Sequence, residues 1–341
     1  MEVVAPETVG LSRTRLDKLT TWMDDQVTSN RLAGLSTMIH RRGECAYFNC
    51  TGQIDVEAGP VEEFYRQNKI IFNPGRQTED GTDLAETTRR LATAPLVRQP
   101  GSGWGYSVAI DVLGRLVEVW SEQTLEAFFA ERIFRPLGMT DTAFQVAADK
   151  VDRFAACYDP SEGGGLAGIG SQNSHIRRSA GVGLKLNDAP ADSHYLKAPV
   201  TLSGGGGLTS TIGDYGRFCA MLLQKGELDG ARVLGRKTVE FMTVNHLPDN
   251  KDMATMGQPV WSESSTEGIG YGLGMAVVID APTTQVMRST GEYFWGGAAS
   301  TAFWIDPSED LFVVFMTQLV PSSFYPLRNE LRVATYQALV D

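Results

Sequence analysis

Tyr106 and Ser107 stand directly before a stretch of helical periodicity, where their side chains could take part in proton transfer. The N-terminal end of a helix dipole is positive and favours a negatively charged group such as a phenolate. Tyr106 is therefore a candidate for moving a proton, and Ser107 is a candidate to assist it through a hydrogen bond. Plainer roles also fit, because an aromatic ring can pack against the start of a helix and a serine there often caps it.

A second group of residues lies near the C-terminal end, where Trp295 is followed by Gly296, Gly297 and Ala298. Paired glycines in a strand mark either a bulge or a place where another group approaches the backbone closely. These residues alone therefore assign the segment no chemical role.

Three segments together resemble the serine β-lactamase and penicillin-binding-protein-like carboxylesterase family, which includes class C β-lactamase-like esterases. They are residues 100–107 (PGSGWGYS), 135–142 (RPLGMTDT) and 294–298 (FWGGA). Enzymes of this family place a Ser-x-x-Lys helix, a tyrosine-centred loop and a short Gly-rich strand around one cleft. The serine needs a nearby base, which a Lys and a Tyr of lowered pKa supply together. The acyl oxyanion needs two backbone N–H donors.

The resemblance assigns roles to six residues. Tyr106 matches the family's tyrosine, and the N–H of Ala298 matches the oxyanion donor on the strand, so these two are the predicted catalytic groups. The predicted substrate-binding residues are Ser107, Trp295, Gly296 and Gly297. The resemblance implies no cofactor, because side chains and backbone donors carry the family's chemistry.

The nucleophile of this family is missing from the chain. No Ser-x-x-Lys occurs at any serine, and the nearest approximation, Ser193 with Lys197, is one residue too long. In relatives, the first strand pair is followed by the nucleophile helix and a Ser-Gly-Leu loop, whereas here Gly59 is followed directly by Pro60. The sequence therefore predicts an internal deletion at residues 59–61, and a hydrolase that is impaired as written.

Two substitutions bear on the substrate that the resemblance implies. Trp295 stands where a β-lactamase carries a lysine that would hold a carboxylate, and Val108 stands where it carries an asparagine amide. Both changes favour a short, neutral ester over a penicillin. We therefore expect a small-molecule ester as the partner, with weak or no β-lactamase activity.

The elements that must position these residues follow from hydrophobic periodicity. Residues 61–142 are mainly helical in pattern, and residues 163–207, rich in Gly, Ser, Asp and Pro, suggest a long irregular connection. Helices are predicted at residues 11–30, 107–121, 214–223, 237–243 and from about 326, and strands at 35–40, 45–50, 271–280, 300–305 and 311–318.

Strands at both ends and helices between them predict an α+β protein with the β-lactamase/penicillin-binding-protein-like fold. One antiparallel sheet would combine N-terminal and C-terminal strands, with flanking helices and an incomplete helical lobe. We expect a single domain of residues 1–341, with a sheet lobe of residues 1–59 and 270–341 and a helical lobe of residues 60–269.

The composition of the chain limits which classes of partner it can bind. The net charge of −11 and a pI near 5.0 argue against nucleic acid. No signal-like start and no run of eighteen apolar residues occur, so we expect a cytoplasmic protein without membrane contact. Neither the four histidines nor the four cysteines show metal-site spacing, so no metal is predicted, and the cysteines suggest no disulfide framework.

Two alternatives to an esterase-type hydrolase stay open. The chain could be a non-catalytic binding or regulatory protein that keeps the cleft around Tyr106 and Trp295. It could also use a displaced nucleophile such as Ser102 or Ser107, although neither has a lysine three residues on. Acylation by a serine-directed probe separates catalysis from binding.

Overall fold

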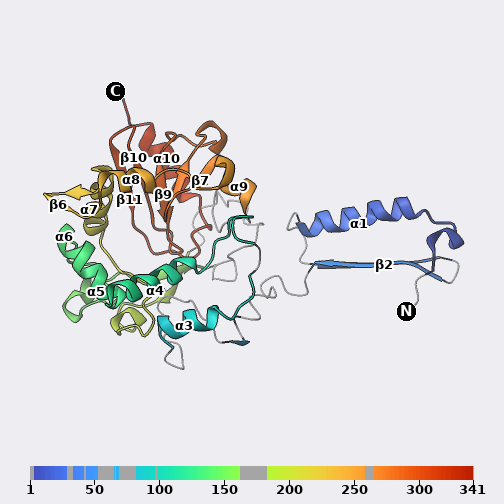
Figure 1. Cartoon of the computed structure of the whole chain (residues 1–341), viewed down its shortest axis with the longest axis horizontal. Coiled ribbons are helices and arrows are strands. Elements are labelled where there is room, and N and C mark those ends of the chain that lie inside the picture. The colour runs from blue at the N-terminus through green and yellow to red at the C-terminus, as the bar shows by residue number, and fades with distance from the viewer. Residues whose placement is uncertain are drawn as a thin grey trace. The chain divides into compact units, whose positions relative to one another are not determined.

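The structure is a computed structural model, and it describes residues 4–28, 34–41, 44–52, 65, 67–68, 82–96, 99–161, 183–257 and 265–340. The chain divides into two compact units, Met1–Lys69 and Ile70–Asp341 (Figure 1). The predicted deletion point at residues 59–61 lies outside the described residues. Within the described part of the chain, no helix is long and apolar enough to cross a membrane.

The N-terminal unit consists of a helix and a β-hairpin. Its elements are the short 3₁₀ helix η1 (Pro6–Val9), α1 (Arg13–Thr28), β1 (Gly34–Arg41) and β2 (Glu44–Gly52). β1 and β2 pair antiparallel, and α1 packs against them. Met23 on α1 is fully buried and Ala46 on β2 is 2% exposed, so the apolar side of the helix covers the hairpin. The helix and the two strands predicted here are confirmed.

A five-stranded antiparallel sheet forms the centre of the C-terminal unit, in the order β11-β10-β9-β8-β7. β10 is buried at every position, and Trp304 and Ile305 on it are completely inaccessible. The predicted α+β fold with an antiparallel sheet is thereby confirmed. The strands are β7 (Ile269–Tyr271), β8 (Ala276–Val278), β9 (Tyr293–Gly296), β10 (Ala302–Asp306) and β11 (Leu311–Phe315).

The single strand predicted at residues 271–280 is instead a turn between two strands, β7 and β8. The N–H of Gly272 donates to the carbonyl of Met275 at 2.8 Å, and Gly274 has a φ of 97°. This left-handed conformation is readily accessible to glycine. Apolar residues on both sides of the turn hid the reversal from the sequence pattern.

The described strands form two separate groups of pairings. β1 and β2 pair with each other, and the five-stranded sheet consists of strands from the C-terminal unit. The expectation that N- and C-terminal strands share one sheet stays a prediction. Alternation of side chains specifies which face of a strand is buried, but backbone hydrogen bonds do not specify which edge it joins. The assignment of residues 1–341 to a single domain stays a prediction.

Helices cover the sheet of the C-terminal unit. Cys219, Met221 and Leu222 of α7 are buried in one core with Phe303 and Ile305 of the sheet. The helices are α3 (Leu84–Leu91), α4 (Ala109–Ser121), α5 (Leu125–Phe129), α6 (Arg135–Leu137), α7 (Ile212–Leu223), α8 (Arg236–Met242), α9 (Met253–Met256) and α10 (Leu327–Tyr336). The helices predicted at residues 107–121, 214–223 and 237–243 and near 326 are confirmed.

The two faces of the sheet meet different helices because side chains alternate along each strand. Phe303 and Ile305 face the core that contains α7. Phe294 and Trp304 are directly paired across β9 and β10, and Arg332 of α10 lies over both of their rings. Since Trp295 follows Phe294, its side chain belongs to the α7 face, whereas Gly296 faces α10.

The predicted irregular connection over residues 163–207 contains a strand. β4 (Leu184–Asp188) pairs antiparallel with β3 (Cys157–Pro160), and residues 162–182 lie outside the described part of the chain. A second small hairpin joins β5 (Glu227–Leu228) to β6 (Ala231–Arg232). The remaining short helical turns are η2 (Ala130–Phe134, π-helical) and the 3₁₀ helices η3 (Ala148–Arg153), η5 (His194–Leu196), η6 (Pro248–Asn250) and η7 (Pro282–Thr284).

Candidate functional site

Tyr106 lies in the loop that leads into α4, and its side chain is 54% exposed. A backbone hydrogen bond holds this loop at Trp104, whose N–H donates to the carbonyl of Met256 at 2.8 Å. The strand-like contact continues as a parallel bridge between Trp104 and Gly257. A side chain at Gly257 would collide with this loop, because its Cβ would lie 2.8 Å from the Trp104 carbonyl oxygen.

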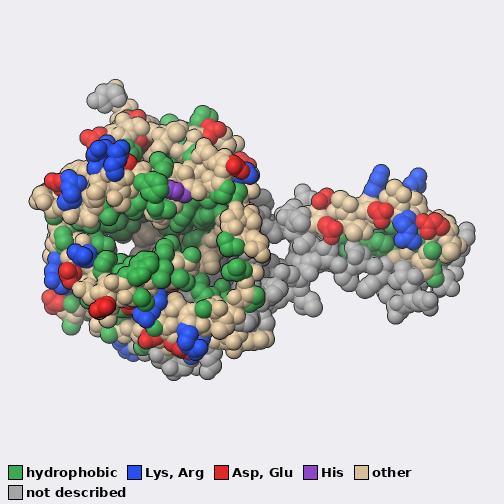
Figure 2. Space-filling view, in the orientation of Figure 1, with side chains coloured by type: hydrophobic (Ala, Val, Ile, Leu, Met, Phe, Trp, Pro, Cys, Tyr) green, Lys and Arg blue, Asp and Glu red, His purple; other side chains and the backbone are tan. Residues whose placement is uncertain are grey.

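The structure brings Tyr106 together with Trp295, as the sequence predicted. Their ring centroids are 6.1 Å apart and their planes differ by 13°, so the rings stack. Tyr271 contacts Trp295 edge-on at 5.6 Å, and Trp104 lies 5.4 Å from Tyr271. We call these four side chains the aromatic wall. Figure 2 shows that hydrophobic side chains gather around a hollow in this unit, beside α4 in the orientation of Figure 1.

The glycine-rich turn after β9 is held from the other face of the sheet by Arg328 of α10. Its guanidinium donates to the carbonyls of Gly297 at 2.8 Å and Thr301 at 3.1 Å. A Cβ at Gly296 would lie 2.6 Å from the Arg328 Cζ, so a larger residue here would displace the guanidinium from this turn. Ala298 is exposed, and its N–H has no hydrogen-bond partner among the described residues. The N–H is therefore available to a ligand, and its role as oxyanion donor stays a prediction.

The electrostatics of Tyr106 differ from the expectation of a lowered pKa. Burial raises the pKa of its phenol above the usual value, and the negative charge of Asp111 adds to this rise. Burial likewise raises the pKa of the neighbouring Tyr271. Both effects favour the neutral form, so Tyr106 is a neutral phenol at neutral pH.

In the part of the chain that the structure describes, no base contacts either of the two serines considered as displaced nucleophiles. Ser102 donates to the carbonyl of Gln99 at 2.7 Å, and a carbonyl cannot accept the proton in catalysis. Ser107 is exposed, and its hydroxyl has no hydrogen-bond partner among the described residues. Ser107 does not cap α4 either, because the cap position is Val108.

The apolar side chains of α4 are partly or largely exposed. Only Asp111 and Gly114 of this helix are buried. Leu113 is 52% exposed and Trp120 is 75% exposed. Patterning alone predicts the opposite arrangement, with the apolar side inward and the polar side outward.

Sequence reasoning missed Asp111 and Ser203, which meet beside this loop. Asp111 is 6% exposed and Ser203 is 7% exposed, and the Ser203 hydroxyl donates to the carboxylate of Asp111. A carboxylate in the first turn of a largely apolar helix and a serine preceding four glycines were the available signals. Neither residue alone indicates a partner so distant in the sequence.

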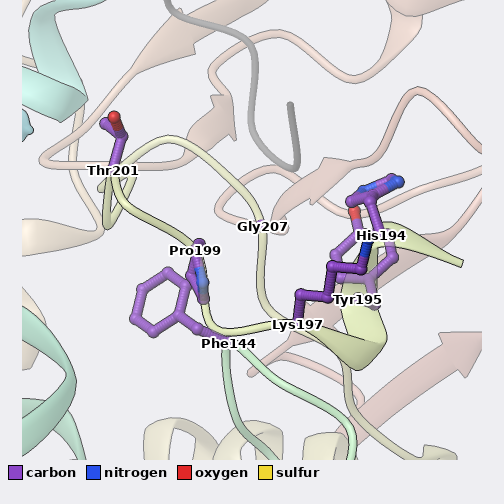
Figure 3. A pocket seen from close by; sticks show the side chains of 7 residues that line it. All are labelled: Phe144, His194, Tyr195, Lys197, Pro199, Thr201 and Gly207. Carbon is purple, nitrogen blue, oxygen red and sulfur yellow. The ribbon is translucent and has the colours of Figure 1, made fainter. Parts of the chain in front are cut away.

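A separate small pocket of about 20 Å³ is lined by Phe144, His194, Tyr195, Lys197, Pro199, Thr201 and Gly207 (Figure 3). A space of this size holds about one water molecule and no ester. It contains Lys197 of the near-match to the nucleophile motif. Ser193 of that near-match is 1% exposed and donates to Asp188 at 2.7 Å, so it is engaged elsewhere.

Metal-ligand side chains do not gather in the part of the chain that the structure describes, where no group of three or more His, Cys, Asp or Glu could hold an ion. Cys219 is buried and Cys157 is half-buried, and both are unbonded thiols. Burial raises the pKa of the Cys219 thiol to about 12, which leaves it unreactive at neutral pH.

Several known proteins are similar to this chain. An uncharacterized protein of Mycobacterium tuberculosis is 36% identical over 235 residues, which cover 68% of this chain and 52% of that protein. Esterase EstB of Burkholderia gladioli is 30% identical over 265 residues, covering 74% of this chain and 59% of EstB. The chain thus spans little more than half the length of these relatives.

Solved structures show the same fold. EstCE1, described as a hydrolase with promiscuous acyltransferase activity, superposes with a TM-score of 0.60 at 19% identity, covering 94% of this chain and 97% of EstCE1. A mutant of simvastatin synthase from Aspergillus terreus gives a TM-score of 0.53 at 25% identity, covering 71% of this chain and 57% of that one. The Beta-lactamase family model matches residues 69–337. With its aromatic wall, its glycine-rich strand and this match, the chain belongs to the Beta-lactamase family.

Proposed function

We propose that this chain derives from a serine carboxylesterase acting on short neutral esters, and that as written it binds such esters without turning them over efficiently. The stacked pair Tyr106 and Trp295 carries the proposal, because it joins the predicted tyrosine loop to the predicted oxyanion strand. EstB and the lovastatin esterase of Penicillium rubens, which is 29% identical over 242 residues, support an ester as the substrate class.

The character of the aromatic wall favours a neutral ligand. Tryptophan and tyrosine rings offer apolar and polarizable contact area, and they provide no charge to pair with a carboxylate. Arg328, the cation that reaches the glycine-rich turn, lies on the opposite face of the sheet and donates to backbone carbonyls there. A penicillin carboxylate would therefore lose its hydration without gaining a partner at Trp295.

Impairment follows from the missing nucleophile and from the state of Tyr106. The chain has no Ser-x-x-Lys, the motif that supplies the activated hydroxyl in this family. The raised pKa of Tyr106 also makes it a poor base at neutral pH, because it holds its proton. Oxyanion donors and binding can still leave some acceleration over water.

The second candidate function is ligand binding without catalysis. It is favoured by the same neutral Tyr106, because a neutral phenol can donate a hydrogen bond to an ester carbonyl. The two candidates differ in one observable, which is covalent modification of a serine.

Intact-mass measurement after treatment with a fluorophosphonate probe tests the proposal, together with stopped-flow hydrolysis of p-nitrophenyl butyrate. We expect no stoichiometric adduct and no burst, with slow turnover at most. Calorimetric titration with ethyl butyrate and with butyrate should show preference for the neutral ester, and Trp295→Ala should abolish it. A stoichiometric burst that disappears when one serine is changed contradicts the impaired state, and stronger binding of butyrate contradicts the substrate class.

A further inference from the structure

Asp111 is a buried carboxylate that points away from its own helix terminus toward a distant segment. Its Oδ1 accepts hydrogen bonds from the Ser203 hydroxyl and from the N–H of Gly205, the latter at 3.4 Å. The Gly205 N–H also lies 3.2 Å from the Ser203 Oγ. Among the described residues Asp111 forms no ion pair, so these neutral donors alone satisfy its charge. A buried charge is costly unless it is hydrogen-bonded, which gives the contact a strong preference for this geometry.

Next to this carboxylate, the backbone of α4 lies close to the backbone of the segment that contains Gly204. A Cβ at Gly204 would lie 2.3 Å from the carbonyl oxygen of Ile110, and a Cβ at Gly114 would lie 3.2 Å from the Gly204 Cα. Only glycine permits such an approach between the helix and the segment. We call Ser203 to Gly207 the glycine segment. Its contact with the start of α4 is therefore both close-packed and hydrogen-bonded.

This contact matters for Tyr106 because little else buries α4. The apolar side chains of the helix stay partly or largely exposed, whereas Asp111 and Gly114 are the two residues that are buried. Tyr106 precedes Asp111 by little more than one helical turn of chain. The contact between Asp111 and Ser203 is therefore placed to fix the position at which the loop of Tyr106 ends and α4 begins.

One charged group acts on Tyr106 from the elements around it. Burial raises the pKa of Tyr106, and the negative charge of Asp111 on α4 adds to this rise. Tyr271 on β7 is a neighbouring phenol, and burial raises its pKa as well. Trp295, which stacks on Tyr106, does not titrate.

We propose that Asp111 is a positioning residue that anchors the Tyr106 loop to the glycine segment through its hydrogen bonds with Ser203 and Gly205. The anchoring is independent of the proposed function, and only its meaning for catalysis rests on that function. The negative charge of Asp111 also disfavours the phenolate of Tyr106, which gives the contact an electrostatic readout.

Titration of Tyr106 tests the electrostatic effect on the chain as it exists. Carbon-13 NMR of protein labelled at tyrosine Cζ follows the phenol, and Tyr106→Phe assigns its signal. Asp111→Asn keeps an oxygen acceptor for Ser203 and removes the charge, so the midpoint should move to lower pH. Asp152→Asn removes an exposed charge elsewhere in the unit and should leave the midpoint unchanged. Equal midpoints in the two variants overturn this effect.

Hydrogen–deuterium exchange tests the anchoring. Ser203→Ala and Asp111→Ala each break the contact, so amide exchange should become faster in residues 100–108 and in the glycine segment. Asp111→Asn should stay close to the parent, because its amide oxygen still accepts from Ser203. Unchanged exchange in Ser203→Ala overturns the anchoring. Neither readout depends on turnover, so an absence of esterase activity would weaken the proposed function and leave this inference standing.

Discussion

α4 and α7 have similarly apolar sequences, and the structure treats them in opposite ways. Cys219, Met221 and Leu222 of α7 are buried against the sheet. α4 buries a carboxylate and a glycine, and it leaves Leu113 and Trp120 more than half exposed. The difference shows that an apolar stripe on a helix does not by itself guarantee that another element covers it. α7 has its partner in the described part of this chain, whereas the apolar side chains of α4 stay partly or largely exposed there.

Restoring the missing segment should abolish this difference. Inserting a relative's segment, from the strand end through the Ser-x-x-Lys helix to the Ser-Gly-Leu loop, between Gly59 and Val61 should produce esterase activity. A helix that buries about six large apolar side chains gains on the order of 10 kcal/mol from burial, before the loss of chain entropy. Urea unfolding measures the gain in stability, and p-nitrophenyl butyrate hydrolysis measures the gain in esterase activity.

Within the repaired chain, Tyr106→Phe should lower kcat by about 10²–10⁴, the contribution of a positioned proton-transfer group. Benzylpenicillin should remain almost untouched, because Trp295 replaces the cation that would bind its carboxylate. A repaired protein that folds cooperatively and stays inert, or one indifferent to Tyr106→Phe, would show that this cleft is not an esterase site.

Truncation of one side chain on each helix sharpens the comparison. Leu222→Ala on α7 should lower the free energy of unfolding by about 2–5 kcal/mol, because it leaves a cavity in a closed core. Trp120→Ala on α4 should change it by no more than about 0.5 kcal/mol, since the ring is 75% exposed. Denaturant melts of both variants decide the matter, and a large loss with Trp120→Ala would mean that α4 is covered in solution.

Removal of a phenol hydroxyl compares the two faces of the sheet in the same way. The Tyr336 hydroxyl lies 2.7 Å from a carboxylate oxygen of each of the fully buried Glu292 and Asp306. Tyr336→Phe should therefore cost about 1–3 kcal/mol of unfolding free energy. Tyr106→Phe should be nearly neutral in the chain as written, because its ring is half exposed. Thermal unfolding of matched samples provides the check, and equal losses would contradict the contrast.

The smallest expected effect concerns the exposed face itself. Trp120→Gln should reduce binding of an apolar dye such as ANS with a stability change within about 0.5 kcal/mol. Phe241→Gln on α8 is a suitable control, since Phe241 is 61% exposed and lies on another helix. Dye binding that falls equally in both variants would indicate general surface exposure and no special role for α4.

Local pattern was sufficient for most elements, and it singled out Tyr106 and Trp295, which the structure stacks on each other. Periodicity placed α1, α4, α7 and the C-terminal strands, since a helix or strand needs only its own residues to show its repeat. It failed between β7 and β8, where apolar residues continue through a turn that Gly274 makes possible. The raised pKa of Tyr106 was also out of reach, because burial and the charge of Asp111 depend on the folded surroundings.

The sequence by itself determined the family motifs, the absence of a Ser-x-x-Lys and the apolar stripe of α4. The tertiary structure alone decided that Tyr106 stacks on Trp295, that Arg328 holds the glycine-rich turn and that Asp111 meets Ser203. It also decided that α4 stays exposed while α7 is covered. The physical reason is that hydrophobic repeats and helix caps depend only on residues of the same helix or strand. The partner of a strand edge, a buried carboxylate or an apolar face is chosen by packing between segments far apart in the chain.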